Sequence, residues 1–302
     1  MSFSFTRRTD VKDQVRRIAI DQVQSAITEC RGDGDLDKTV HGLRRRCKKL
    51  RGLLRLIEPK CRVFDAENRV VRDAAQGLSG TRDAAVMVET FDALVEFDSR
   101  REGSPQLNAA LSGSVRRILR GRVIAGPEAI DRQQLLGDLV AALTPLAKRA
   151  ETWAIEGRGF ACLGAGLEQT YRCMRDGMAH ARDEGSAEAL HDWRKHAKYH
   201  WHHVGLLQRA APELLHGRKN LVDQLAELLG DHHNLHVLHE ALTTAPEPVA
   251  AEGIETLGDV IAERQAVLVA RAFELGRQLA VEKPAALRRR FELYWQLLPD
   301  AE

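Results

Sequence analysis

The stretch from His41 to Arg55 reads HGLRRRCKKLRGLLR and contains seven lysines and arginines but no carboxylate. Placed on an α-helix at ~100° per residue, its charged and apolar side chains separate onto opposite faces. The cationic face holds His41, Arg44, Arg45, Lys48, Arg51 and Arg55. The apolar face holds Leu43, Cys47, Leu50, Leu53, Leu54 and Ile57. Because like charges along one stripe repel one another, the pattern predicts a partner that carries regularly spaced negative charge.

The composition restricts the classes of protein to consider. The 302 residues carry 45 Lys and Arg against 43 Asp and Glu, so the positive charge of this stripe is local and indicates one anion site. The five cysteines form no CxxC pair, and we expect free thiols rather than disulfides or a zinc site. The chain shows neither a signal-peptide pattern nor an apolar run of membrane-spanning length. We therefore expect a cytoplasmic protein without a membrane partner.

Helical periodicity runs through the whole chain and no segment alternates like a strand, so the predicted fold class is all-α. The expected helices of the first half span about 10–30, 37–58, 60–76, 81–98, 105–121 and 127–156. Pro145 is expected to kink or interrupt the last of them. The expected helices of the second half span about 160–184, from 186 onward, 212–229, 231–243, 254–281 and 284–298.

Part of the basic stretch recurs 150 residues later, where LHDWRKHAK at 190–198 aligns with VHGLRRRCK at 40–48. In the second copy one helical face carries His191, Arg194, Lys195, Lys198 and His202. A further pair of segments, LSGTRD at 78–83 and LGDHHN at 229–234, follows the two copies at matched spacing. The repetition predicts an internal duplication. An approximate two-fold axis between the halves would bring both basic stripes onto one groove or surface.

The motif HxxR(R/K)xxK, present twice and each time followed by a Gly-x-x-Asp/Asn type of segment, resembles that of the CHAD family, the conserved histidine α-helical domain. The similarity covers nearly the whole chain, which we expect to be a single CHAD-like domain over 1–302 with half-repeats 1–156 and 157–302. It implies two pseudo-symmetric helical-bundle halves whose long antiparallel helices surround a basic groove or surface. It also implies non-catalytic binding of inorganic polyphosphate, often at polyphosphate granules.

The chain departs from the family in two respects. Family members are often fused to a triphosphate-tunnel catalytic domain, but the ExExK signature of that domain is absent from this sequence. Asn234 stands where an Asp is usual. The second half is also the less cationic one, because Tyr199, His200 and Trp201 replace Lys49, Leu50 and Arg51 of the first copy.

A polyphosphate-binding surface needs positive charge and hydrogen-bond donors at regular spacing. Arginine offers a forked pair of donors to phosphate, and successive helical turns advance by ~5.4 Å along the stripe. The predicted polyphosphate contacts are His41, Arg44, Arg45, Lys48, Lys49, Arg51, Arg55, Arg82, Arg172, Arg175, His191, Arg194, Lys195, Lys198 and His202. His41 and His191 head the two stripes, so binding should tighten as pH falls through about 6–7, unless these histidines only cap or orient their helices.

Other interpretations of the same residues stay open. The stripe could be an ordinary solvated face, and the i,i+4 pairs His196/His200 and His232/His236 could hold a transition metal. Neither pair has an obvious third ligand, so we expect no cofactor. Nucleic acid is expected only as a non-specific competitor, because no aromatic residue interrupts the first stripe and Tyr199 and Trp201 are interpreted as packing residues.

Catalysis is not expected. The chain has no P-loop, no HExxH and no compact carboxylate set for Mg²⁺. Asp83, Asp231 and Asn234 are predicted to cap helices or to orient nearby cations. The sequence carries no signal for an oligomeric state.

Overall fold

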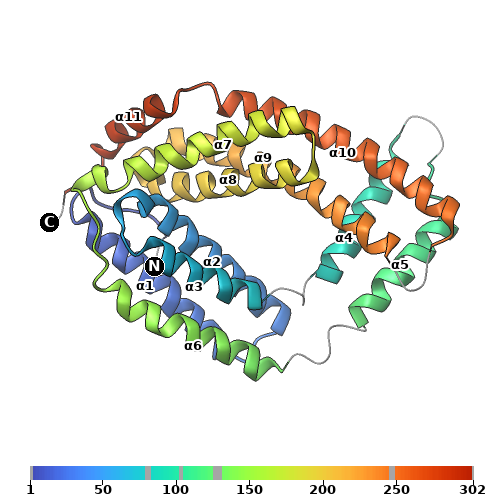
Figure 1. Ribbon diagram of the computed structural model, residues 1–302, viewed down its shortest axis with the longest axis horizontal. Helices are drawn as coiled ribbons and strands as arrows, with labels where there is room; N and C mark the ends of the chain where they lie inside the picture. Colours follow the sequence, from blue (N-terminus) through green and yellow to red (C-terminus); the bar gives the residue numbers. More distant parts are fainter. Residues whose placement is uncertain (1–2, 79–82, 102–104, 125–130, 245–248, 301–302) are drawn as a thin grey trace.

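The computed structural model describes residues 3–78, 83–101, 105–124, 131–244 and 249–300 (Figure 1). Within these ranges the chain is helical and contains no strand beyond an isolated bridge between Cys61 and Ile155, which confirms the all-α prediction. The first six α-helices are α1 (Val11–Cys30), α2 (Leu36–Ile57), α3 (Phe64–Gly77), α4 (Asp83–Ser99), α5 (Ala109–Ile124) and α6 (Arg132–Ala150). The others are α7 (Gly164–Glu184), α8 (Ala187–Leu207), α9 (Pro212–Thr243), α10 (Ala251–Leu279) and α11 (Pro284–Trp295). Three short 3-10 helices are η1 (Glu58–Lys60), η2 (Gly159–Cys162) and η3 (Gln208–Ala210).

Capping residues fix where the two motif-bearing helices begin. The side chain of Asp35 accepts the backbone N–H of Lys38 at the start of α2, and Ser186 accepts that of Ala189 at the start of α8. Each cap satisfies a backbone donor that the helix itself leaves unpaired, which is worth about 1 kcal/mol. The apolar face predicted for α2 is buried over its whole length, so the predicted orientation of this helix is confirmed.

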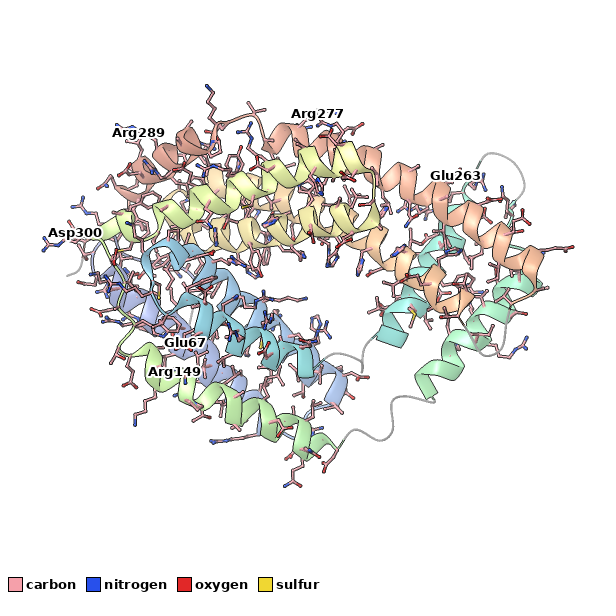
Figure 2. The ribbon with its side chains drawn as sticks, in the orientation of Figure 1. Glu67, Arg149, Glu263, Arg277, Arg289 and Asp300 are labelled. Carbon is pink, nitrogen blue, oxygen red and sulfur yellow. The ribbon has the colours of Figure 1, made fainter. Side chains whose placement is uncertain are left out.

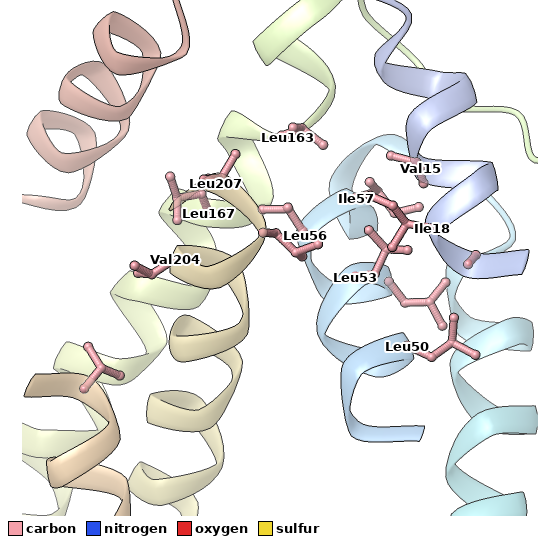
Figure 3. Close-up of a cluster of buried hydrophobic side chains, with 14 of the residues drawn as sticks. Val15, Ile18, Leu50, Leu53, Leu56, Ile57, Leu163, Leu167, Val204 and Leu207 are labelled. Atoms are coloured by element: carbon pink, nitrogen blue, oxygen red, sulfur yellow. The ribbon is translucent and has the colours of Figure 1, made fainter. Parts of the chain in front are cut away.

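α2 lies at the centre of the larger of two hydrophobic cores. Figure 3 shows Leu53 and Ile57 of α2 directed at Val15 and Ile18 of α1. On the opposite side Leu56 meets the residues that α7 and α8 contribute. At about 1.5–3 kcal/mol for each fully buried aliphatic side chain, these contacts hold α2 rigidly between the helices on either side.

The smaller core joins helices that are distant in sequence. It combines α4 and α5 with the C-terminal part of α9 and the N-terminal part of α10, at one end of the molecule (Figure 1). Its buried members include Phe91, Leu94, Val115, Leu119, Leu235, Leu238, Leu257 and Val260. Both cores therefore draw on residues from each side of the predicted half-repeat boundary at 156/157.

One detail of the helical prediction is wrong, because the segments 212–229 and 231–243 form one continuous helix, α9. Pro145 lies inside α6 and does not interrupt it, and a kink at this residue stays a prediction. Gly230 lies in the interior of α9 and does not end a helix. A Cβ at this position would be 3.0 Å from Nε of Arg194 on α8, which belongs to the end of a flexible side chain.

α2 and α8 approach each other closely at Gly52. A Cβ at this position would lie 2.6 Å from Cβ of His202, and Nε2 of the buried His203 donates a hydrogen bond to the Gly52 carbonyl (3.0 Å). Gly166 of α7 has a similar role, because its missing Cβ would lie 2.1 Å from the Leu56 carbonyl oxygen. Small residues therefore set the distance between α2 and the two helices of the second half.

Ion pairs on the periphery fasten outer helices to this framework. Arg149 of α6 donates two hydrogen bonds, of 2.8 and 2.7 Å, to the buried carboxylate of Glu67 on α3. Figure 2 shows both residues near the point where α6 passes α3. None of the described helices combines the length and the apolar character needed to cross a bilayer.

Candidate functional site

A cavity of about 500 Å³ lies between α2, α8, α9 and the first turn of α4, and we call it the α2–α8 cavity. It is lined by His41, Arg44, Arg45, Lys48, Val86, His191, Arg194, Lys198, Trp201, His202, His233 and Asn234. Eight of these were predicted contacts: His41, Arg44, Arg45, Lys48, His191, Arg194, Lys198 and His202. The structure thus places residues of both sequence motifs around one space.

The lining of this cavity is strongly cationic. Five of its residues are lysine or arginine and four are histidine, and none of the described lining residues carries a carboxylate. Positive charges gathered in a recess create a field that attracts anions from solution. The lining of the α2–α8 cavity therefore favours an anion over a cation.

Arg44 and Arg194, which occupy the same position of the two motifs, are held in similar ways. Arg44 Nη1 donates to the backbone carbonyl of Leu78 at 3.2 Å, and Arg194 Nε donates to that of Ala226 at 3.3 Å. A carbonyl oxygen orients a guanidinium without cancelling its charge. The nearby Asp231 carboxylate also interacts with the charge of Arg194. Lys198 differs, because its ammonium already pairs with Asp223 at 3.0 Å.

Three histidines of the cavity, His191, His202 and His233, are kept neutral by their surroundings. Burial, helped by the positive charge of Lys195 and Arg194, lowers the pKa of His191. Burial and the neighbouring His191 and Arg194 lower that of His233 to about 4. The two rings lie 4.3 Å apart between centroids, and Nδ1 of His191 is buried without a hydrogen-bond partner among the described residues. In the free protein His191 therefore contributes little charge at neutral pH, contrary to a simple cationic role.

His202 is the deepest of these histidines. Burial, followed by the charges of His203, Lys198, Lys49 and Lys48, lowers its pKa to about 3. It lines the cavity as a neutral ring, which can donate or accept a hydrogen bond but adds no charge.

Six of the other predicted contacts do not line this cavity. The more C-terminal turns of the stripe face neighbouring helices: Arg51 Nε donates to Asn68 on α3 (3.1 Å), and Arg55 pairs with Glu58 (2.8 Å). Carboxylates within the same helix hold Lys195 (Asp192) and Arg172 (Glu168). Lys49 and Arg175 do not line the cavity either, and Arg82 lies outside the described residues.

Sequence reasoning missed several lining residues. Val86 and His233 were not proposed, and Trp201 was interpreted as a packing residue although it lines the cavity. The LGDHHN segment at 229–234 did indicate the part of α9 that lines the cavity. Asp231 and Asn234 lie inside this helix, so neither caps it, but Asp231 is close enough to Arg194 and Arg264 to interact with their charges, as the alternative prediction of a cation-orienting role requires. The side chain of Asp83 lies outside the described residues.

The histidine pairs considered as metal ligands have other surroundings. His200 is fully buried, and its Nε2 accepts a hydrogen bond from Nε of Arg218 at 3.2 Å. His236 lies 3.7 Å from the Glu240 carboxylate. His196 is half-buried and His232 is buried. Among the residues that the structure describes, no three potential ligands of the His, Cys, Asp or Glu type come together.

Comparisons with known proteins agree with this architecture. A model of the CHAD domain family matches residues 15–243, from α1 to the end of α9. Among solved structures, PptA from Streptomyces chartreusis is similar to the chain with a TM-score of 0.58 at 11% sequence identity, over 92% of this chain and 100% of PptA. At that identity the likeness shows a shared fold. No curated protein matches the chain.

Proposed function

The chain belongs to the CHAD domain family, and from this membership we propose that the α2–α8 cavity binds inorganic polyphosphate without catalysing a reaction on it. The observation that carries the proposal is the convergence of Arg44 and Lys48 with Arg194 and Lys198 around one cavity whose described lining has no carboxylate. A linear polymer of phosphates has no bases to recognise, so charge and donors suffice. Each well-formed charge-assisted hydrogen bond contributes about 1.5–3 kcal/mol.

We further infer that the cavity is a groove at the junction of two duplicated halves. α2 ends at Ile57 and is followed by η1 at 58–60, while α8 ends at Leu207 and is followed by η3 at 208–210, so the same succession recurs at an offset of 150 residues. Gly52 and His202, which touch where α2 meets α8, are also 150 residues apart. Contact between equivalent positions is expected near a two-fold axis. These correspondences support half-repeats over 1–156 and 157–302.

The proposal of binding without catalysis is tested separately. Incubation of the protein with long-chain polyphosphate should leave the chain-length distribution unchanged and release no orthophosphate. We also propose a cytoplasmic location with recruitment to polyphosphate granules, which a fluorescent fusion should show. Loss of the granule signal in a strain that makes no polyphosphate is the expected control result.

The binding experiment compares two double charge reversals. Arg44→Glu/Lys48→Glu alters the cavity, and Arg62→Glu/Lys148→Glu makes the same charge change at exposed positions outside its lining. We expect the first variant to lose at least about 100-fold in affinity for long-chain polyphosphate, since two charge-assisted contacts are removed. The control should lose far less. Helical circular dichroism should be the same for both.

Competition with single-stranded DNA of matched charge, at low and physiological salt, identifies the polymer. Retention of polyphosphate at physiological salt, with little displacement by DNA, supports a surface suited to linear phosphate. Equal competition by DNA and parallel loss of both ligands with salt would show a generic electrostatic patch and refute the proposal. An equal loss of affinity in both double variants would refute the assignment of the site.

A further inference from the structure

A second cavity, of about 430 Å³, adjoins the α2–α8 cavity, because Trp201 and His202 line both. Its other lining residues come from the N-terminal segment, α2, α8, η3 and α9, and include Phe3, Lys49 and Lys219. We call it the Lys49 cavity. None of the described residues that line it carries a carboxylate.

Aromatic rings, and not carboxylates, position the lysines of the Lys49 cavity. The Lys49 ammonium lies 5.3 Å from the centroid of the Phe3 ring, and the Lys219 ammonium lies 4.7 Å from that of Trp201. Neither lysine forms an ion pair within the described part of the chain. A π face attracts an ammonium but leaves its charge in place. Both charges are therefore held in position and remain uncompensated.

The surroundings of Lys49 show that positive charge is crowded here. Burial lowers the pKa of Lys49, and the nearby cations Arg45, Arg46 and Lys219 lower it further. The indole N–H of Trp201 is also buried without an acceptor among the described residues. A bound anion would relieve the repulsion between the cations. A bound oxyanion could also accept a hydrogen bond from a donor such as the indole N–H.

Trp201 connects the two cavities. Lys198, which lines the α2–α8 cavity, lies 5.2 Å from the centroid of its ring, and Lys219 from the Lys49 cavity lies 4.7 Å from it. On α2, the adjacent residues Lys48 and Lys49 line one cavity each. Cationic side chains thus extend from the first cavity to the second, and of these Lys198 is paired with Asp223.

We propose that the Lys49 cavity is a second phosphate site, which takes a short run of phosphates held by Lys49 and Lys219. The phosphates belong either to a free oligophosphate or to the end of a longer chain that leaves the α2–α8 cavity past Trp201. The second source rests on the proposed function, whereas the first does not.

Lysine acetylation followed by peptide mass spectrometry tests this site directly. Inorganic tripolyphosphate should slow acetylation of Lys49 and Lys219 several-fold, and should leave the exposed Lys148 unaffected. The protection should persist in Arg44→Glu/Lys48→Glu. In that background, further Lys49→Gln/Lys219→Gln substitution should weaken tripolyphosphate binding at least about tenfold in calorimetry. Lys60→Gln/Lys148→Gln in the same background is the matched control and should leave binding unchanged.

Long-chain polyphosphate distinguishes the two sources. If long chains protect Lys49 from acetylation in the wild type but not in Arg44→Glu/Lys48→Glu, the second site holds the end of a chain that starts in the first cavity. If tripolyphosphate protects Lys49 in both proteins, the second site binds a free oligophosphate. If neither phosphate protects Lys49 and Lys219 in the wild type, the second site is refuted. Failure of the proposed function has a different signature, because long-chain affinity would then be insensitive to Arg44→Glu/Lys48→Glu.

Discussion

Replacement of Gly52 by alanine tests whether the close approach of α2 and α8 holds the cavity together. Glycine inside a helix is normally unfavourable, so from helix propensity alone Gly52→Ala should stabilise the protein by about 1 kcal/mol. The structure predicts the opposite sign. The new Cβ would lie 2.6 Å from Cβ of His202, where ~3.5–4.0 Å is the favourable separation between carbon atoms.

The expected loss follows from the contacts at this position. Because Cβ of His202 is attached directly to the backbone of α8, rotation of its side chain cannot relieve the clash, and the helices must separate by about 1 Å. Overpacking of this kind costs about 1–3 kcal/mol. The movement also disturbs the buried hydrogen bond from His203 to the Gly52 carbonyl, worth about 1–3 kcal/mol if the groups are left unpaired. After the gain from helix propensity is subtracted, the Gly52→Ala protein should be less stable than the wild type by about 3 kcal/mol.

Urea unfolding followed by circular dichroism measures this difference. Gly137→Ala is the control, because Gly137 also lies within a helix, α6, but has no atom within 4 Å of the position of its missing Cβ. We expect the control to gain about 0.5–1 kcal/mol. Polyphosphate affinity should fall in Gly52→Ala alone, since α2 and α8 both line the cavity. A Gly52→Ala protein as stable as the control would refute the reasoning.

Two further predictions concern pH. His202 and His203 are buried, and burial is the main cause that lowers the pKa of each to about 3, so the unfolded chain binds more protons between pH 6.5 and 3. The free energy of unfolding should therefore fall as pH drops below about 6, by up to about 1.4 kcal/mol per pH unit for each histidine. Urea titrations that give the same free energy of unfolding at pH 6.5 and 4.5 would contradict this prediction. Polyphosphate should raise the pKa of His191 and His233, so binding should take up protons and tighten as pH falls from 6.5 toward 5.5. Calorimetry in buffers of different ionisation enthalpy measures the uptake, and its absence would exclude a charge role for these rings.

Helical periodicity predicted most of the fold because it depends on local physics. The alternation of cationic and apolar side chains from His41 to Arg55 specifies both the helix and its buried face, and the structure agrees. The continuity of α9 was not predictable in this way. Gly230 has the same local signature as a helix terminator, but the helix continues through it, with Arg194 of the neighbouring α8 beside this turn.

The candidate site was predictable to the extent that it repeats a helical face. Arg44 and Lys48, with Arg194 and Lys198, share a motif, and the structure gathers them around one cavity. Arg51 shares the stripe too, but it contacts Asn68, because α3 covers that turn of α2. Which neighbour covers each turn is a property of tertiary packing, and the helical period contains no information about it. The position of Trp201 between two cavities is likewise set by tertiary packing.

The smaller core has a consequence for how the protein is made. α4 and α5 leave the ribosome well before α9 and α10, against which their apolar residues finally pack. At about 5–20 residues per second, this wait lasts on the order of ten seconds. During that time Phe91, Leu94 and Val115 have no permanent partner from the second half of the chain. We therefore expect nascent chains halted between α5 and α9 to expose these apolar residues, to be prone to aggregate and to be substrates for a chaperone.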